Sequence, residues 1–151
     1  MLVRNAPHGL ALLLLALAGC GIARSLPTSA LNQLGVVAEP GANSDAATAL
    51  DVVFVYDPQA DPVLPPTGAE WFTRKSAYLQ KLGPAVDVVS LELAPATTVR
   101  DVALPPRYRQ ALAVYAYANY LAPAGQPRQS LGAYSRAVIR LAPDHVVVEQ
   151  R

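Results

Sequence analysis

The chain has 151 residues, of which 52% are apolar and only 15% are charged, and it contains 14 prolines and one cysteine. Its formal net charge of +1 and its lack of a basic cluster exclude a protein that binds nucleic acid through phosphate contacts. The single cysteine excludes an internal disulfide framework, an iron–sulfur cluster and a cysteine zinc site, so the length indicates one domain held together by packing.

The first segment of the chain has the pattern of a secretory signal. Arg4 precedes an uncharged apolar run over residues 10–19 (LALLLLALAG), and a positive region followed by a short apolar stretch is typical of such signals. A helix of this length spans about 15 Å, roughly half of the hydrocarbon core of a bilayer. The segment is therefore too short for a transmembrane helix.

A short motif at the end of this segment indicates lipid attachment. The residues that end at Cys20 read LAGC, which resembles the bacterial lipobox, where the signal is cleaved before a cysteine that then carries lipid. An ordinary signal peptide with a chance cysteine is the alternative. We predict a lipoprotein signal peptide over residues 1–19, a lipidated N-terminus and tether over 20–33, and a β-sandwich domain over 34–151. By resemblance to enterobacterial lipoproteins, Gly21 in place of Asp favours the periplasmic face of the outer membrane.

Short β-forming runs separated by proline and glycine make up most of the remaining chain. The predicted strands are residues 34–39, 50–56, 86–93, 97–104, 111–121, 134–141 and 145–149. The run over 50–56 (LDVVFVY) is almost continuously apolar, as expected for a strand that is covered on both faces. The run over 111–121 alternates, so that Val114 and Ala116 share one face and Tyr115 and Tyr117 share the other.

One segment has helical periodicity instead. Residues 69–82 place an apolar stripe on one side of a helix, formed by Trp71, Phe72, Tyr78, Leu79 and Leu82. Gly83 and Pro84 then end it. The fold class predicted from these runs is mainly all-β: an antiparallel β-sandwich of about seven to eight strands with one inserted short helix, which covers the core.

Catalytic and metal sites find little support in the sequence. His145 is the only histidine after the signal segment, and no nucleophile elbow accompanies it. Asp57 and Asp61 supply too few oxygens for calcium and fit ordinary turn chemistry before proline. We therefore predict no enzyme, no catalytic residue, no metal, and no cofactor beyond covalent lipid on Cys20.

Two surface features remain as candidate binding sites. The first is a set of tyrosines that could stack on a sugar: Tyr108, Tyr115, Tyr117 and Tyr120. Half-buried sheet surface is the alternative, and the one favoured for tyrosines on strands. The second is the loop over residues 57–67, in which four prolines surround Val63 and Leu64. Proline lowers the entropy that a loop loses when a partner immobilises it. The loop suits protein docking, and a stiff connector into the helix is the alternative reading.

The order of these segments resembles one family. A lipobox and tether are followed by GVVAEPGANSD, a DVVFVYD strand, the aromatic WF on a helix, VDVVSLELAP, ALAVYAYANY and a YSRAVIRL ending. This order resembles the TssJ family, the outer-membrane lipoproteins of the type VI secretion membrane complex. The resemblance covers nearly all of the chain after the signal. It implies a transthyretin-like sandwich without enzymatic activity that binds the periplasmic C-terminal region of the inner-membrane protein TssM.

The resemblance also assigns a role to the proline-rich loop, since the loop after the early strand is the family's partner-binding element. The partner-binding residues implied here are Asp57, Pro58, Asp61, Pro62, Val63, Leu64, Pro65 and Pro66. Val63 and Leu64 are the expected contacts. The alternatives are a lipoprotein that binds glycan or peptidoglycan through the Tyr115 and Tyr117 face, and an accessory lipoprotein of another envelope complex.

Overall fold

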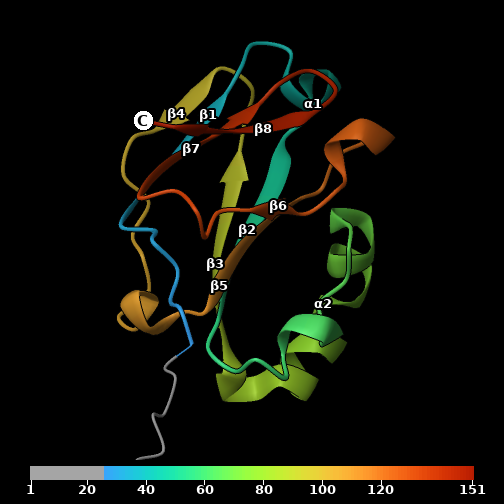
Figure 1. Ribbon diagram of the computed structural model, residues 1–151. Coiled ribbons are helices and arrows are strands. Elements are labelled where there is room, and N and C mark those ends of the chain that lie inside the picture. The colour runs from blue at the N-terminus through green and yellow to red at the C-terminus, as the bar shows by residue number, and fades with distance from the viewer. Residues whose placement is uncertain (1–25) are drawn as a thin grey trace, which may run out of the picture.

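The computed structural model describes residues 26–151, which form a sandwich of two four-stranded sheets (Figure 1). The predicted signal peptide and Cys20 lie outside the described residues. The strands are β1 (Gln33–Ala38), β2 (Thr48–Val55), β3 (Val86–Leu93), β4 (Thr97–Val99), β5 (Ala113–Ala118), β6 (Gln129–Ser130), β7 (Arg136–Leu141) and β8 (Val146–Gln150). One sheet has the order β4-β1-β7-β8 and the other the order β3-β2-β5-β6. The predicted β-sandwich is confirmed.

Strand pairing departs from the prediction in one place. β1 runs parallel to β7, from Gln33 opposite Arg136 to Ala38 opposite Leu141, whereas the other strand pairs are antiparallel. A purely antiparallel sandwich was therefore wrong for this pair. Parallel neighbours need a long crossover, and most of the chain, including the other sheet, lies between these two strands. Periodicity within a strand carries no information about which distant strand will lie beside it.

One predicted strand is shorter in the structure, and one short helical turn was not predicted. Residues 97–104 form a strand only over Thr97–Val99, because the chain then leaves the sheet edge before Pro105 and Pro106. A further short element, α1 (Ala42–Asp45), is a single turn whose Asn43, Ser44 and Asp45 have φ values of 52°, 56° and 62°. Asn43 holds this left-handed turn against the end of β5, since its amide group donates to the carbonyl of Asn119 at 3.1 Å and accepts from the amide of Leu121 at 2.8 Å.

The main core lies between the two sheets. It is built from inward-facing side chains of both, among them Leu34, Val36, Leu50, Val52, Phe54, Val114, Ile139 and Leu141. β2 is buried along nearly its whole length, as its continuous apolar run predicts. In β5, Val114 and Ala116 face this core while Tyr115 and Tyr117 face the other way, which confirms the predicted alternation.

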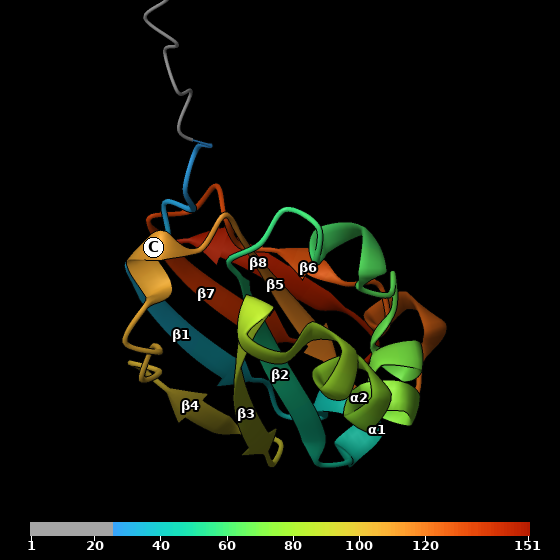
Figure 2. The ribbon, with the colours of Figure 1, turned by 90° about the horizontal axis from the view of Figure 1, so that it is seen from below.

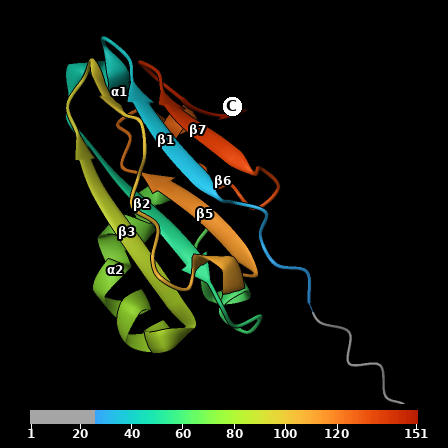
Figure 3. The ribbon, with the colours of Figure 1, turned by 90° about the vertical axis from the view of Figure 1, so that its left-hand side faces the viewer.

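Helix α2 (Gly68–Leu82) covers the other face of the sheet that contains β2, β3 and β5 (Figures 2 and 3). Its predicted apolar stripe forms a second core with the outer side chains of β2 and β5, and only Leu79 of that stripe remains largely exposed. Trp71 is fully buried and stacks between two rings, with its centroid 5.0 Å from that of Tyr117 and 5.7 Å from that of Tyr78.

A buried carboxylate also holds α2 on the sheet. Asp51 of β2 is only 1% exposed. Its Oδ2 accepts a hydrogen bond from Nε1 of Trp71 at 2.7 Å and lies 2.7 Å from the ammonium group of Lys75. Both partners come from α2, so the carboxylate joins the helix and the strand through one oxygen. We call Asp51, Trp71 and Lys75 the helix clamp.

The start of α2 makes a close approach to β5. A Cβ atom at Gly68 would overlap the carbonyl oxygen of Ala118, so no larger residue fits there without moving backbone. Thr67 caps the helix, since its hydroxyl accepts from the amide of Glu70 at 3.3 Å. The sequence places glycine at the one helical position where the sheet leaves no room for a side chain.

The chain enters the sandwich before β1. Residues 29–33, which the sequence analysis assigns to the tether, already pack on the domain: Leu31 is 2% exposed, and the amides of Ser29 and Ala30 donate to the carbonyls of Ala111 and Gly132. Within residues 26–151, none of the helices has the length and apolar content needed to cross a bilayer.

We expect the free energy of unfolding to fall between pH 10 and pH 12. Burial raises the pKa of Tyr117 and of Tyr120 to about 12, and their hydroxyls donate to the carbonyls of Pro65 and Ala142 at 2.8 and 2.7 Å. An unfolded tyrosine titrates near 10. Above that pH the unfolded state therefore binds fewer protons than the folded state, and stability decreases by up to about 1.4 kcal/mol per pH unit for each tyrosine.

Urea denaturation at a series of pH values from 9 to 11.5 measures this decrease. Tyr120→Phe removes one of these groups and is expected to make the decrease less steep by up to about 1.4 kcal/mol per pH unit, even though the variant is less stable at neutral pH. An unchanged slope in Tyr120→Phe would contradict the assignment to these tyrosines.

Candidate partner-binding loop

The proline-rich loop connects β2 to α2 and lies at the end of the sandwich where the chain enters (Figure 1). Leu26 and Pro27 face Pro58 and Asp61 of the loop across a cleft of about 230 Å³. The loop and the beginning of the described chain are therefore neighbours in space, although about thirty residues separate them in the sequence.

Local hydrogen bonds give the loop a defined shape. The carboxylate of Asp57 accepts from the amide of Gln59 at 2.8 Å, and its carbonyl accepts from the amide of Ala60 at 2.9 Å. A 3-10 turn over Asp61–Val63 follows, with Pro62 in its first positions. Aspartate starts the turn through its side chain and proline restricts φ inside it, so the loop is stiff, as the sequence predicts.

The inner side of the loop belongs to the second core. Ala60 and Leu64 are 3% and 6% exposed, and Pro65 is buried with its carbonyl on the hydroxyl of Tyr117 at 2.8 Å. The expectation that Leu64 contacts a partner therefore does not fit its burial. Val63 packs against the edge of the second core and keeps part of its surface exposed, whereas Leu64 lies within that core.

Arg128, which was not predicted as a site residue, fixes the loop from the opposite side. Its guanidinium lies 4.1 Å above the ring of Tyr115, and its Nη1 is 3.9 Å from Oδ1 of Asp61. Its amide donates to the carbonyl of Pro66 at 2.9 Å. Burial, and then Asp61, raise the pKa of Tyr115. No local pattern relates Arg128 to a loop some sixty residues earlier, because the fold alone brings them together.

The outer side of the loop presents Val63 at the centre of a shallow surface. Val63 is half-buried and lines two clefts, one of about 370 Å³ and one of about 230 Å³. Helix α2 contributes Lys81 to both clefts and Arg74 to the larger one. Pro58, Pro62 and Pro66 are exposed around them. An apolar centre with cationic neighbours suits a protein surface that has an apolar anchor and an acidic rim.

The other candidate sites are differently placed. The predicted tyrosines do not form one exposed sugar platform, because Tyr117 is 0% exposed beneath Trp71 of α2 and Tyr120 is 3% exposed in the main core. His145 lies exposed in the β7–β8 turn, with Nδ1 2.7 Å from the carboxylate of Asp144. That hydrogen bond lowers the pKa of Asp144. Within residues 26–151, no group of three or more acidic, histidine or cysteine side chains could hold a metal ion.

Comparisons with known proteins identify the architecture. No family model and no curated protein sequence matches the chain. Among solved structures, the type VI secretion lipoprotein TssJ1 from Pseudomonas aeruginosa aligns with a TM-score of 0.60 at 17% identity, over 79% of this chain and 94% of that one. Serratia marcescens Lip, a membrane-bound component of the type VI secretion system, gives a TM-score of 0.56 at 15% identity, over 78% and 96% of the two chains.

A third structure is described as the TssM C-terminal domain (869-1107) of the type VI secretion system from EAEC. One of its chains aligns with a TM-score of 0.55 at 15% identity, over 78% of this chain and 98% of that chain. At these identities the likeness concerns the fold. The chain has the fold of the TssJ lipoproteins.

Proposed function

We propose that this protein is a non-catalytic, lipid-anchored subunit of a type VI secretion membrane complex, related to the TssJ lipoproteins. The observation that carries the proposal is the shared sandwich, since TssJ1 and Lip align over nearly their whole length. The lipobox that ends at Cys20 and the order of the strand and helix segments agree with it. Fold alone does not assign function, so the proposal also depends on the anchor and the loop.

Cys20 is the proposed point of attachment to the membrane. A single acyl chain gives only reversible binding, whereas several chains on one cysteine anchor a protein stably. Gly21 favours the outer membrane, which places the sandwich on its periplasmic side.

The loop surface around Val63 is the proposed contact with the periplasmic domain of a TssM-like inner-membrane protein. This protein shares its fold with one chain of the structure that is described as the TssM C-terminal domain. The stiffness of the loop supports the assignment, because Tyr117 and Arg128 hold it before any partner binds. A loop ordered in advance loses little entropy on binding.

We expect Val63→Asp to weaken binding of the purified periplasmic domain of the TssM-like protein by at least about tenfold, since a charge replaces the apolar centre of the surface. Because Val63 is only half-buried, the free energy of unfolding should change by less than about 1 kcal/mol. Isothermal titration calorimetry with the detergent-solubilised lipoprotein and urea denaturation measure the two quantities.

Two further variants act as controls for this experiment. Leu121→Asp makes the same kind of change at a leucine that is 68% exposed, on a loop next to α1 rather than the proline-rich loop, and should leave affinity unchanged. Leu64→Asp buries a charge in the second core and should destabilise the protein by about 3 kcal/mol or more. Wild-type affinity in a folded Val63→Asp variant would show that the partner binds elsewhere.

A further inference from the structure

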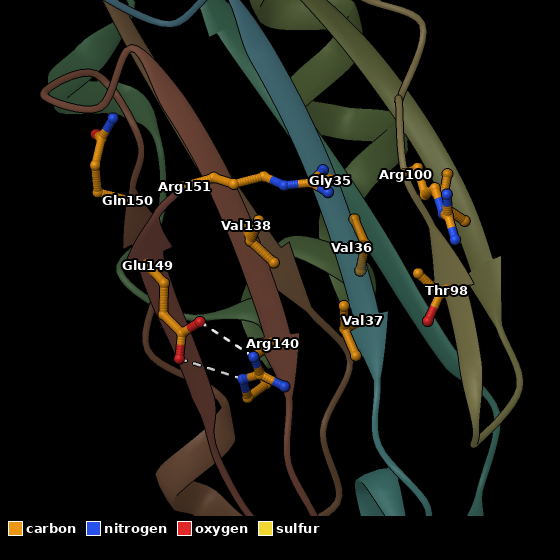
Figure 4. A pocket seen from close by; sticks show the side chains of 11 residues that line it. Gly35, Val36, Val37, Thr98, Arg100, Val138, Arg140, Glu149, Gln150 and Arg151 are labelled. Carbon is orange, nitrogen blue, oxygen red and sulfur yellow. Dashed lines mark hydrogen bonds and ion pairs between the residues drawn. The ribbon is translucent and has the colours of Figure 1, made fainter.

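Helix α2 packs on the β3-β2-β5-β6 sheet and leaves the outer face of the β4-β1-β7-β8 sheet uncovered. A cleft of about 470 Å³ lies on this face, with Gly35 of β1 at its centre (Figure 4). We call the outward-facing residues around Gly35 the arginine face; they are Gly35, Val37, Arg100, Arg136, Val138, Arg140, Glu149 and Arg151. It is separate from the proline-rich loop, none of whose residues lines this cleft.

Strand register places the side chains of the arginine face in rows across the sheet. Gly35 lies opposite Val138, and Val138 lies opposite Glu149. Arg100 follows Val99 and reaches the level of Gly35, where its carbonyl oxygen would be 3.1 Å from any Cβ that replaced the glycine hydrogen. This row therefore has Arg100 at one end and Glu149 at the other, with a position that carries no side chain, Gly35, and the half-buried Val138 between them.

The next row brings two arginines together. The amide of Arg151 donates to the carbonyl of Arg136 at 2.9 Å, so that the two residues lie on neighbouring strands. Like charges at such positions destabilise a sheet. Figure 4 shows the side chain of Arg151 extending across Val138 toward Gly35, into the space that the glycine leaves open.

The carboxylates of this face do not neutralise these arginines. Glu39 and Glu149 both pair with Arg140, at 3.4 and 3.1 Å. Over residues 26–151, the cations that have no carboxylate at ion-pair distance are Lys81, Arg100, Arg109, Arg136 and Arg151. Three of these five lie on the arginine face, in a chain whose overall charge is nearly balanced. Most of the cations without a carboxylate partner are thus concentrated on the arginine face.

We propose that the arginine face binds an acidic, extended segment of a protein partner. Guanidinium groups pair with carboxylates through two parallel hydrogen bonds, and half-buried Val37 and Val138 supply an apolar floor between them. Neighbouring rows on the sheet are two residues apart, about 6.7 Å, which is also the spacing of side chains on one face of an extended peptide. Carboxylates at alternate positions of such a segment therefore have the same spacing as successive rows of side chains on the sheet.

A fluorescein-labelled ten-residue peptide of alternating glutamate and valine is the probe. Anisotropy titration uses the detergent-solubilised full-length protein at low ionic strength, and we expect saturable binding that weakens with added salt. The double variant Arg100→Gln with Arg151→Gln should weaken binding about tenfold, because it removes two exposed ion pairs at the cleft. A peptide of alternating lysine and valine should not bind.

The matched control is Arg107→Gln with Arg109→Gln, which removes the same charge beyond this face. Circular dichroism establishes that both variants are folded, and the control is expected to bind the acidic peptide as the wild type does. An equal loss of peptide affinity in both double variants would mean that only the net charge of the protein matters, and would overturn the proposal. It would also be overturned if the acidic peptide failed to saturate, or if vesicles of phosphatidylglycerol bound through Arg100 and Arg151 while the peptide did not.

Discussion

Replacing Asp51 with alanine is expected to lower the free energy of unfolding by about 3–5 kcal/mol, which is a large part of the stability of a domain of this size. The carboxylate accepts from the indole of Trp71 and pairs with Lys75 at 2.7 Å in each case. Its removal leaves a partly buried ammonium group and an indole N–H without their partner. The loss of stability arises more from these unpaired polar groups than from the lost attraction between the charges.

Urea denaturation of Asp51→Ala at pH 7 measures the change. Arg74→Ala is the matched control, because Arg74 belongs to an exposed ion pair on the same helix, with its Nη1 3.7 Å from Glu70 Oε1, and should cost less than about 1 kcal/mol. Asp51→Asn retains an oxygen for Trp71 and should fall between the two. A loss below about 1 kcal/mol in Asp51→Ala would mean that the helix clamp does not hold α2 on the sheet.

Replacing Cys20 with serine is expected to transfer the whole protein from the membrane fraction to the soluble periplasmic fraction, because serine lacks the thiol to which the acyl chains would be attached. Each buried methylene contributes about 0.8 kcal/mol to membrane binding, so the loss of the chains is an all-or-none effect. Ultracentrifugation of cell envelopes followed by immunoblotting measures the distribution.

The domain itself should be unaffected by this change, since its packed residues begin well after Cys20. Wild-type circular dichroism and urea midpoints in Cys20→Ser are therefore the control. Gly21→Asp keeps the lipid and is expected to move the protein to the inner membrane. Retention of Cys20→Ser in the membrane fraction would contradict lipid anchoring through this cysteine.

The fold could be predicted from the sequence where a pattern is local. The continuous apolar run of β2 and the helical stripe of α2 each gave the correct element with ends within about two residues. The parallel neighbour of β1 could not be predicted in this way, because it depends on a pairing across a hundred residues. Asp51 did leave a signal: an acidic residue inside a strand covered on both faces needs a partner.

The prolines indicated the candidate loop in the sequence, but they did not indicate which of its side chains would be buried. Leu64 and Val63 are adjacent and both apolar, and only the fold decides that Leu64 is buried in the second core while Val63 stays half-buried at its edge. The contacts of Arg128 and the arginine face could not be predicted for the same reason, since each depends on residues that are distant in sequence and meet only in the fold. The sequence indicates which residue types are present, and the sheet register decides which of them are neighbours.

The position of β1 at the beginning of the sandwich, on the side of the proposed anchor, has a mechanical consequence. If Cys20 is held in a membrane and the rest of the domain is pulled by a partner, tension first reaches the sandwich at Ser29 and Ala30, whose amides are bonded to Ala111 and Gly132, and then loads β1 along its axis. This strand lies inside its sheet, bonded to β7 over six residue pairs and to β4 over three. Because such hydrogen bonds run across the strand direction, an axial load shears them all at once instead of opening them one by one. A strand at the edge of the sheet would be bonded on one side only and would yield at a lower force.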